Sequence, residues 1–411
     1  MPFIRRRGVA AAAAVIAAVM MTATACDSNT SHGEATSSAS PQVQDDPGVD
    51  TGQNAGDTIG GFKLPDGIPA ELTGKALQKW KDGGWKDFSH WKSKAEDFAN
   101  PYIKDFWTPD RVAESTPINT KAASVSDIET QSSSTAQVWA PDGSSRRKAA
   151  TRAKTAYTRY EPAMGKLFMT GPDGGHSCSA AVVTDPAHPG KSNLVWTAAH
   201  CIHQGKSGGW LRNIAFVPSY NNTGRYNLQQ ASQKFRTTAV TPRGVWWANW
   251  ATASGHWIKE GNANAGSVGA AYDYAVLHVT PESGSKSLQQ TVGSALPVWF
   301  NAPAAKNVRN MMDFGYPGES PYDGSKLYEC RDARAKRLVV GYTYPSSYPA
   351  MYMMGCTMNH GSSGGPFVLA HKGRNYLVSD NALSDMKTYM AGPRLGSDAK
   401  RVYLATSNKF K

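Results

Sequence analysis

Three short segments of this 411-residue chain carry residue types that can perform nucleophilic catalysis. His200 ends a run of small residues, Asp273 precedes an apolar stretch, and Ser363 lies in the glycine-rich turn Gly-Ser-Ser-Gly-Gly-Pro. A serine hydroxyl is a weak nucleophile at neutral pH, so it needs a base within hydrogen-bond reach, and an imidazole held by a carboxylate can act as that base. The three segments could form one catalytic site if folding brings them together.

Each of these residues also has an alternative role. His200, with Cys201 and His203 close by in the sequence, could belong to a metal cluster. Asp273 could simply cap a turn, although the apolar run after it favours a carboxylate at the mouth of a strand. Ser362, instead of the serine that follows it, could be the nucleophile.

The chain around these segments has the pattern of an all-β domain. From about residue 157, short apolar runs alternate with clusters of Gly, Pro, Asn and Asp, and no long helical periodicity interrupts them. The runs cover residues 180–183, 194–197, 274–279, 296–300, 337–342, 367–369 and 376–379. With 40% hydrophobic and 18% charged residues, a sizeable core can form. This length and pattern predict two small β-barrels.

The motifs and their order resemble the chymotrypsin-like (trypsin-fold) serine peptidases, notably the bacterial secreted members. Residues 197–201 match T-A-A-H-C, and residues 361–366 match G-D-S-G-G-P except at the second position. Asp273 fits the D-[IYL]-A-[LV] strand of that family. The resemblance covers about residue 157 to the end, and it implies an all-β fold with two six-stranded antiparallel β-barrels.

The resemblance also implies a mechanism. Ser363 would attack a peptide bond, with His200 as the general base and Asp273 as the acid that orients it. The backbone N–H groups of Gly361 and Ser363 would form the oxyanion hole. The substrate would be a protein or peptide, with no metal and no cofactor. The alternatives are a catalytically silent binding protein on the same fold and a cell-envelope-binding lipoprotein.

Two positions depart from the family pattern. Ser362 stands where zymogen-activated relatives have an acid that pairs with a new N-terminus, so that switch is not expected. Thr357, six residues before Ser363, stands where a trypsin-type pocket has an acid. Cleavage after Lys or Arg is therefore not implied.

The N-terminus is typical of an exported protein. Residues 1–25 combine a basic start, an apolar stretch and small residues, which predicts a signal peptide. Ala-Thr-Ala-Cys resembles a bacterial lipobox, although Ala23 replaces the usual Leu, and we expect lipidation of Cys26. The protein would then be extracellular, anchored to the outer face of the cell membrane. The other four cysteines read as two disulfides, and the resemblance pairs Cys178 with Cys201 and Cys330 with Cys356.

The region between the signal and the domain is predicted to be disordered and partly helical. Residues 26–75 read as a flexible acidic tether, because residues 27–62 hold six acids and no Lys or Arg. Residues 76–154 form an aromatic segment with a predicted helix over 86–99, and this segment could be a pro-region or could pack on the main domain. The basic residues 146–148 could be its processing site. Residues 155–411 then form the peptidase domain.

The net charge of +12 is assigned to solubility. Cations that alternate with aromatic residues in a nucleic-acid-binding module do not occur, so no nucleic-acid partner is expected. We expect a monomer.

Overall fold

The computed structural model describes residues 98, 100, 102–118, 147–206, 208–262, 268–338 and 351–411, and a short hairpin of β1 (Thr58–Ile59) and β2 (Phe62–Lys63). All of these residues belong to one compact unit. The predicted signal peptide, Cys26, the tether apart from that hairpin, and most of the predicted helix over 86–99 lie outside the described residues.

Among the helices of the described residues, none combines the length and the hydrophobicity needed to cross a bilayer.

The first half of the domain is a closed barrel of six antiparallel strands. Around the barrel the order is β6-β5-β8-β9-β10-β7, and β7 pairs with β6 to close the ring. The strands are β5 (Met164–Gly171), β6 (Gly174–Val183), β7 (Leu194–Thr197), β8 (Arg212–Pro218), β9 (Trp246–Ala253) and β10 (Ala275–Pro281). The chain thus has the trypsin-like all-β fold, and the first predicted barrel is confirmed.

The core of this barrel is rich in tryptophan. Trp196 on β7 and Trp246 and Trp247 on β9 are at most 2% exposed. Every residue of β5, β7 and β8 is buried. β7 is buried on both faces and is accordingly a continuous apolar run in the sequence, whereas β5 and β8 also bury Lys166 and Arg212.

Residues before the predicted peptidase domain also belong to this core. Trp107 is fully buried and donates its indole N–H to the carbonyl of Asn213 on β8 (2.8 Å). The Asn100 amide accepts from the N–H of Ile214 (2.8 Å) and donates to the carbonyls of Ile214 (3.0 Å) and Ala248 (2.8 Å). Asn100 therefore joins β8 to β9 beyond the two residue pairs that connect them directly.

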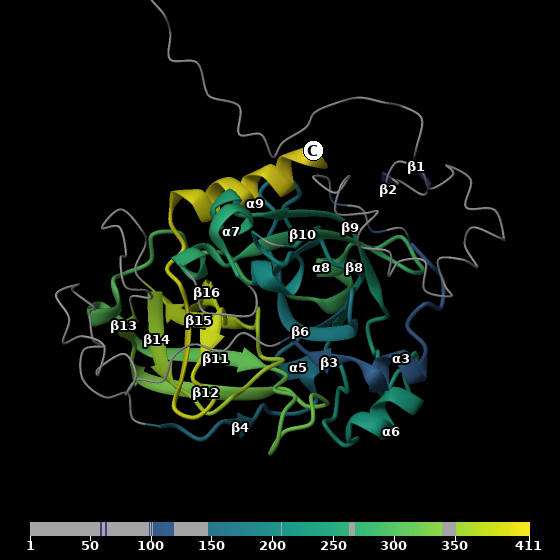
Figure 1. Cartoon of the computed structure of the whole chain (residues 1–411), viewed down its shortest axis with the longest axis horizontal. Coiled ribbons are helices and arrows are strands. Elements are labelled where there is room, and N and C mark those ends of the chain that lie inside the picture. Colours follow the sequence, from purple (N-terminus) through teal and green to yellow (C-terminus); the bar gives the residue numbers. More distant parts are fainter. Residues whose placement is uncertain are drawn as a thin grey trace, which may run out of the picture. The chain divides into compact units, whose positions relative to one another are not determined.

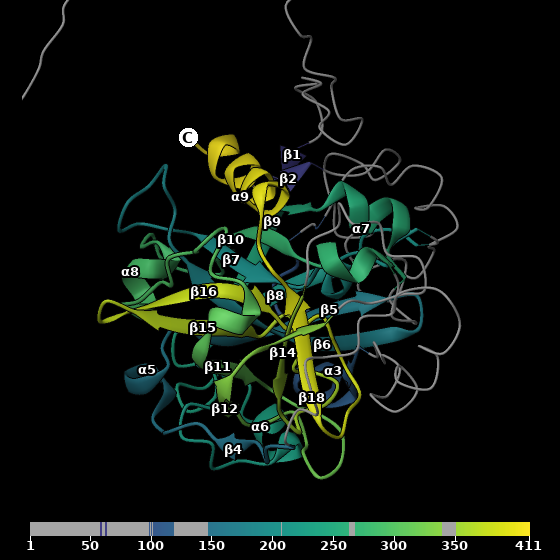
Figure 2. The same cartoon turned by 90° about the vertical axis from the view of Figure 1, so that its left-hand side faces the viewer.

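The second half consists of two sheets (Figure 2). The first has the order β16-β15-β11-β12-β4, and the second has the order β13-β14-β18-β17. The strands are β4 (Thr151–Arg152), β11 (Arg309–Gly315), β12 (Tyr328–Arg334), β13 (Lys336–Leu338), β14 (Met351–Gly355), β15 (Pro366–His371), β16 (Arg374–Asp380), β17 (Leu383–Ser384) and β18 (Tyr389–Pro393). Pairings among the described residues do not join these two sheets into the predicted six-stranded barrel, and β4 pairs with β12 at the edge of the first sheet.

One predicted strand is wrong. Residues 296–300 form no strand, and they make only single parallel bridges, from Leu296 to Val183 and from Val298 to Leu377. These bridges link β6 of the barrel to β16 of the second half, so the apolar run crosses between the two halves.

The helices are short, apart from α9 (Ser397–Lys409), which lies over β9 and β10 (Figure 1). The others are α3 (Pro109–Glu114), α5 (Tyr157–Tyr160), α6 (Leu228–Gln233), α7 (Gly255–Glu260) and α8 (Leu288–Val292), with single 3₁₀ turns η2 (Ala199–Cys201), η3 (Val268–Tyr272) and η4 (Ala305–Asn307). The inward face of α9 includes Thr406 and Ser407, and these polar residues hide its helical periodicity in the sequence.

Candidate active site

Strand pairing brings His200 and Asp273 together. β7 leads into the η2 turn that carries His200, while Asp273 lies just before β10, and the two strands pair antiparallel with Thr197 opposite Ala275. The Asp273 carboxylate makes two bonds to the same histidine. Its Oδ2 lies 2.7 Å from Nδ1 of His200, and its Oδ1 accepts the backbone N–H of His200 at 2.8 Å.

This geometry selects one face of the imidazole. A carboxylate against Nδ1 favours the tautomer with the proton on Nδ1, and Nε2 then carries the free lone pair. Nε2 is buried and has no hydrogen-bond partner within the described part of the chain. Since the His200 and Asp273 side chains are at most 1% exposed, their interaction is shielded from solvent.

Ser363 lies on a turn from the second half, which we call the serine loop (residues 359–365). Ser179 on β6 holds this loop from the barrel side. Its N–H donates to the carbonyl of Ser363 (2.8 Å), and its hydroxyl donates to the carbonyl of Gly361 (2.8 Å) and accepts the N–H of Tyr316 (2.8 Å). Ser179 therefore joins the two halves at the loop.

Glycine is required where the serine loop meets β7. Gly364 has a φ of +76°, and a Cβ on it would lie 2.0 Å from Oγ1 of Thr197 and 2.8 Å from the N of Ala198. Because Thr197 and Ala198 directly precede the His200 turn, this close approach places Ser363 beside that turn. The N–H of Gly364 donates to the carbonyl of Asn381 (2.8 Å), which fixes the loop from its other side.

Two backbone N–H groups of the loop are free. Among the described residues, the N–H groups of Gly361 and Ser363 make no hydrogen bond to the main chain, while the intervening N–H of Ser362 donates to the carbonyl of Asn359 (3.1 Å). Gly361 has a φ of +94°. Two unpaired N–H groups one residue apart can bind an oxyanion.

The two serines of the loop lie in different surroundings. Ser362 is fully buried, and its hydroxyl has no partner within the described residues. A Cβ on Gly315 would come within 2.7 Å of Ser362 Cβ, so Ser362 is packed under the loop. Ser363 keeps 6% exposure, which favours it as the residue that can meet a substrate.

The possible metal cluster does not fit the observed bonding. Sγ of Cys178, Sγ of Cys201 and a ring nitrogen of His200 lie within 4.8 Å of one another. The two sulfurs, however, form a disulfide of 2.03 Å, and a second disulfide joins Cys330 to Cys356. Metal binding would need free thiolates, so these sulfurs are not ligands. Both disulfides match the pairing implied by the resemblance, and they fit an extracellular protein.

A second buried carboxyl group lies behind Asp273, and sequence reasoning missed its character. Asp380 is fully buried at the end of β16 and accepts the indole N–H of Trp196 (2.7 Å). Burial, with a further contribution from the charge of Asp273, raises the pKa of Asp380 well above its usual range. This shift favours the protonated form of Asp380, whereas Asp273 faces the imidazole.

The start of α9 anchors the residue next to Asp273. The Asp398 carboxylate accepts from the hydroxyl of Tyr274 (2.6 Å) and from the hydroxyl of Ser254 (2.8 Å). Burial raises the pKa of Tyr274 well above its usual range, so its hydroxyl keeps its proton and remains a donor. Asp398 thus ties the strand ends around Asp273 to the C-terminal helix.

Thr357, the position discussed for substrate specificity, makes hydrogen-bond contacts to other residues of the protein. The Thr357 hydroxyl accepts the N–H of Ala150 (2.9 Å) and lies 3.0 Å from the Tyr322 hydroxyl. Ser379, at the end of β16, is fully buried. The side-chain amide of Asn381 donates to Asp313 (2.6 Å), and the carbonyl of Asn381 accepts the N–H of Gly364, so this segment supports the serine loop by hydrogen bonds.

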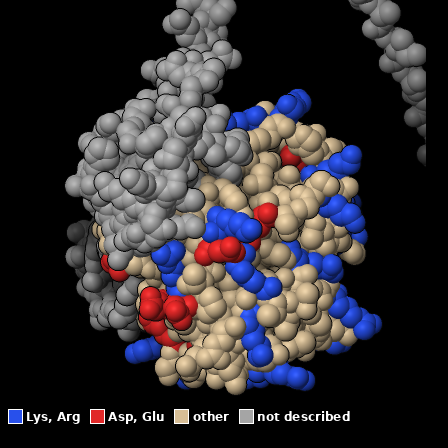
Figure 3. All heavy atoms as spheres, turned by 90° about the vertical axis from the view of Figure 1, so that its right-hand side faces the viewer, with Lys and Arg blue, Asp and Glu red and all other residues tan. Residues whose placement is uncertain are grey.

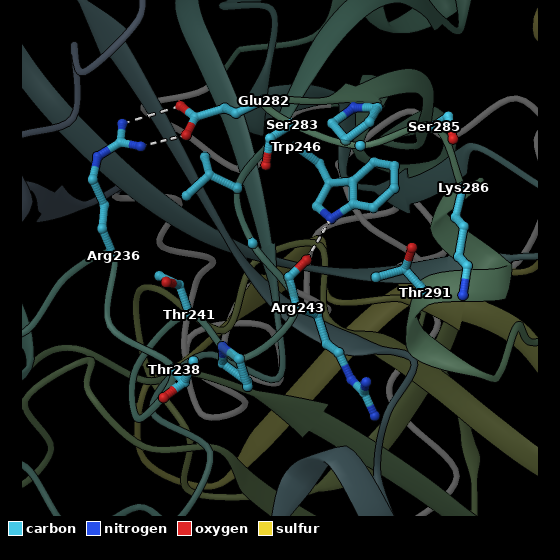
Figure 4. Close-up of a pocket in the computed structure, with 15 residues that line it drawn as sticks. Arg236, Thr238, Thr241, Arg243, Trp246, Glu282, Ser283, Ser285, Lys286 and Thr291 are labelled. Atoms are coloured by element: carbon cyan, nitrogen blue, oxygen red, sulfur yellow. Dashed lines mark hydrogen bonds and ion pairs between the residues drawn. The ribbon is translucent and has the colours of Figure 1, made fainter.

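A separate pocket of about 640 Å³ lies elsewhere (Figure 4). Its walls come from the chain just before β9 and just after β10, which is the opposite end of these strands from Asp273. Its acid, Glu282, is paired with Arg236, and Arg243 and Lys286 add positive charge. This pocket therefore does not include the residues predicted to perform catalysis.

Comparison with known proteins gives structural likenesses only. No family profile and no curated protein matches the chain. A thermostable serine protease from an extremophilic microorganism is 28% identical, over 60% of this chain and 97% of its own, with a TM-score of 0.46. A protease from Arthrobacter nicotinovorans is 27% identical, over 60% and 96%, with a TM-score of 0.46. A Glu endopeptidase is 14% identical, over 65% and 98%, with a TM-score of 0.43.

The closed barrel and the three motifs together resemble one class of protein. A six-stranded antiparallel barrel that carries T-A-A-H-C at the end of one strand and a Gly-x-Ser-Gly-Gly turn packed against it is the arrangement of the chymotrypsin-like serine peptidases. The resemblance predicted from the sequence is confirmed at this level.

Proposed function

We propose that the chain is a serine endopeptidase. Ser363 Oγ attacks the scissile carbonyl carbon while its proton passes to Nε2 of His200. The N–H groups of Gly361 and Ser363 stabilise the oxyanion, and loss of one such donor typically costs about 10²–10³ in rate. The C–N bond then breaks, and His200 gives its proton to the leaving amine. Water, deprotonated by His200, releases the acyl group as a carboxylic acid.

One observation carries this proposal: the Asp273 carboxylate holds both the ring and the backbone of His200, and within the described residues the opposite ring nitrogen has no partner. An unpaired buried polar atom is costly, so a free ring nitrogen on the turn beside the serine loop favours a chemical role for His200. The free N–H groups of Gly361 and Ser363 support the same conclusion.

A fluorophosphonate probe tests the proposal, because it reacts only with an activated serine. We expect labelling of the wild type and of Ser362→Ala, and none of Ser363→Ala. Labelling of Ser363→Ala at the wild-type rate would reject the nucleophile, and failure of the wild type to react or to cleave any casein peptide would favour the silent binding protein.

We also propose that residues 1–25 direct export, that Cys26 is lipidated and anchors the protein to the outer face of the membrane, and that the protein is monomeric. Metabolic labelling with an alkyne palmitate should mark the wild type and not Cys26→Ala, which should appear in the medium.

For the envelope-binding alternative, Lys and Arg are spread over one face of the molecule without a single dominant patch (Figure 3).

A further inference from the structure

The short strand β3 (Thr116–Pro117) covers the edge of β6 beside the proposed active site. β3 runs parallel to β6, with Thr116 opposite His176 and Pro117 opposite Ser177. The N–H of Ile118 donates to the carbonyl of Ser177 at 3.3 Å. β7 pairs with β6 only over residues 181–183, so the stretch before it would otherwise be an open edge.

This edge leads directly into the groups that hold the serine loop. Ser179 lies two residues after Ser177, and it bonds the carbonyls of Gly361 and Ser363. Pro117 also touches the loop itself. A Cβ on Gly361 would lie 3.5 Å from Pro117 Cβ, and a Cβ on Gly318 would lie 2.5 Å from Pro117 Cγ. Pro117 is therefore packed against a residue that contributes an oxyanion donor.

The disulfide between Cys178 and Cys201 indicates whether the substrate residues before or after the scissile bond would lie along this edge of β6. Cys178 on β6 is bonded to Cys201, the neighbour of His200. In the proposed reaction His200 protonates the leaving amine, so the residues after the scissile bond lie on the His200 side, beside β6. An extended peptide binds such an edge by adding a strand, and main-chain hydrogen bonds give much of the affinity.

β3 is exposed at Thr116 and half-buried at Pro117, but the residues around it hold it firmly in place. Two residues before it, Glu114 ends α3, whose Val112 is fully buried. The Ser115 hydroxyl donates to the Val112 carbonyl (2.7 Å), and the Thr116 hydroxyl lies 3.3 Å from Nδ1 of His176. Thr116 and Pro117 are thus fixed from both sides.

We propose that β3, with Pro117 at its end, is the leaving-side wall of the substrate cleft and selects substrates with few residues after the scissile bond. This inference rests on the proposed peptidase function. The β6 edge is already paired, so a longer leaving segment gains no main-chain bonds there and meets the Pro117 ring. The substrate class is therefore peptides cut near their C-terminal end, or acyl compounds with a small leaving group.

The test is a length series of quenched fluorescent peptides with one acyl sequence and one, two or four leaving-side residues, beside the matching p-nitroanilide. We expect kcat/KM of the wild type to fall about tenfold as the number of leaving-side residues increases from one to four. A tenfold change corresponds to the free energy of roughly one hydrogen bond that is not made and one steric clash. Pro117→Gly should reduce that fall to about threefold or less, measured as the ratio of the kcat/KM values of the short and long peptides within each variant. The matched control is Pro109→Gly, an exposed proline at the start of α3, which should keep the wild-type length dependence.

The outcomes separate the two proposals. A flat length series in the wild type, or a Pro117→Gly series equal to that of the wild type, overturns the β3 inference while anilide hydrolysis still supports the peptidase. Ile118→Pro, which removes the N–H donor to Ser177, must act in the same direction as Pro117→Gly. If neither the anilide nor any peptide is cleaved, the peptidase proposal fails and the inference falls with it.

Discussion

The two halves of the domain fix the proposed catalytic residues by different physical means. The barrel sets His200 and Asp273 through strand pairing and two hydrogen bonds of one carboxylate, around a core of tryptophans. The second half sets Ser363 through backbone dihedrals that only glycine adopts readily, and methionines make up much of its separate core. The base therefore depends on side-chain chemistry, whereas the nucleophile depends on main-chain shape.

The largest difference in activity should appear when the two buried acids, Asp273 and Asp380, are substituted one at a time. Asp273→Asn keeps the shape but presents an amide to Nδ1, which favours the wrong tautomer, and kcat should fall about 10⁴-fold. Asp380→Asn replaces a buried carboxyl group, whose raised pKa favours its protonated form, by an amide that can still accept from Trp196, so kcat should stay within about threefold. Equal losses in the two variants, measured by steady-state kinetics with circular dichroism as the folding control, would show that Asp380 also acts on the imidazole.

Two glycines with nearly the same φ test whether the main-chain conformation at Gly364 fixes the position of Ser363. Gly364 (φ +76°) abuts Thr197, whereas a Cβ on Gly293 (φ +77°) would have no neighbour within 4 Å. Gly293→Ala should cost about 1–2 kcal/mol of unfolding free energy from the dihedral alone and leave activity intact. Gly364→Ala should cost about 1–3 kcal/mol more through the clash, and abolish labelling of Ser363. Similar urea midpoints for the two variants would contradict the close packing.

The disulfides offer a comparison between halves at nearly equal loop length. They span 23 and 26 residues, so loss of either should cost about 3.5 kcal/mol through the entropy of the unfolded chain. Only the bond between Cys178 and Cys201 flanks His200. We expect both double-alanine variants to lose stability alike, and only Cys178→Ala/Cys201→Ala to lose kcat at a temperature where both are folded.

The smallest expected effect is on how the unfolding free energy changes with pH. It comes from two buried groups where the halves meet, Glu161 and Lys166. Burial, with a contribution from Glu329, raises the pKa of Glu161 to about 7. The unfolded carboxyl ionises near 4.5, so this group destabilises the fold increasingly from pH 4.5 to 7. Burial lowers the pKa of Lys166, which donates to the Gly324 carbonyl, to about 7. The unfolded amine stays charged up to about 10.5, so this penalty fades as pH rises from 7 to 10.5.

Together these shifts predict a shallow minimum of the unfolding free energy near pH 7, about 1–3 kcal/mol deep. Urea titrations at pH 5, 7 and 9 would measure it. Glu161→Gln should remove the fall below pH 7, and Lys166→Met should remove the rise above it. A monotonic profile that neither variant alters would refute both shifts.

Sequence reasoning reached the fold class and the first barrel, and it proposed the residues of the candidate site, because the signals it used are local. A histidine after small residues and a serine among glycines are readable within six positions. Ser179 was missed as a support of the serine loop because its partner Gly361 lies 182 residues away and a lone serine has no signature. The missing closure of the second half and the insertion of Trp107 into the barrel also depend on tertiary packing, which periodicity does not encode.

Asp398 has a consequence for the order in which the protein is made. Its carboxylate anchors Tyr274, which lies 124 positions earlier and directly follows Asp273. During synthesis, His200 and even Ser363 are therefore present in the chain before Asp398, which anchors the neighbour of Asp273, has been made. We expect nascent chains to remain harmless to the export machinery until α9 has been synthesised and has docked.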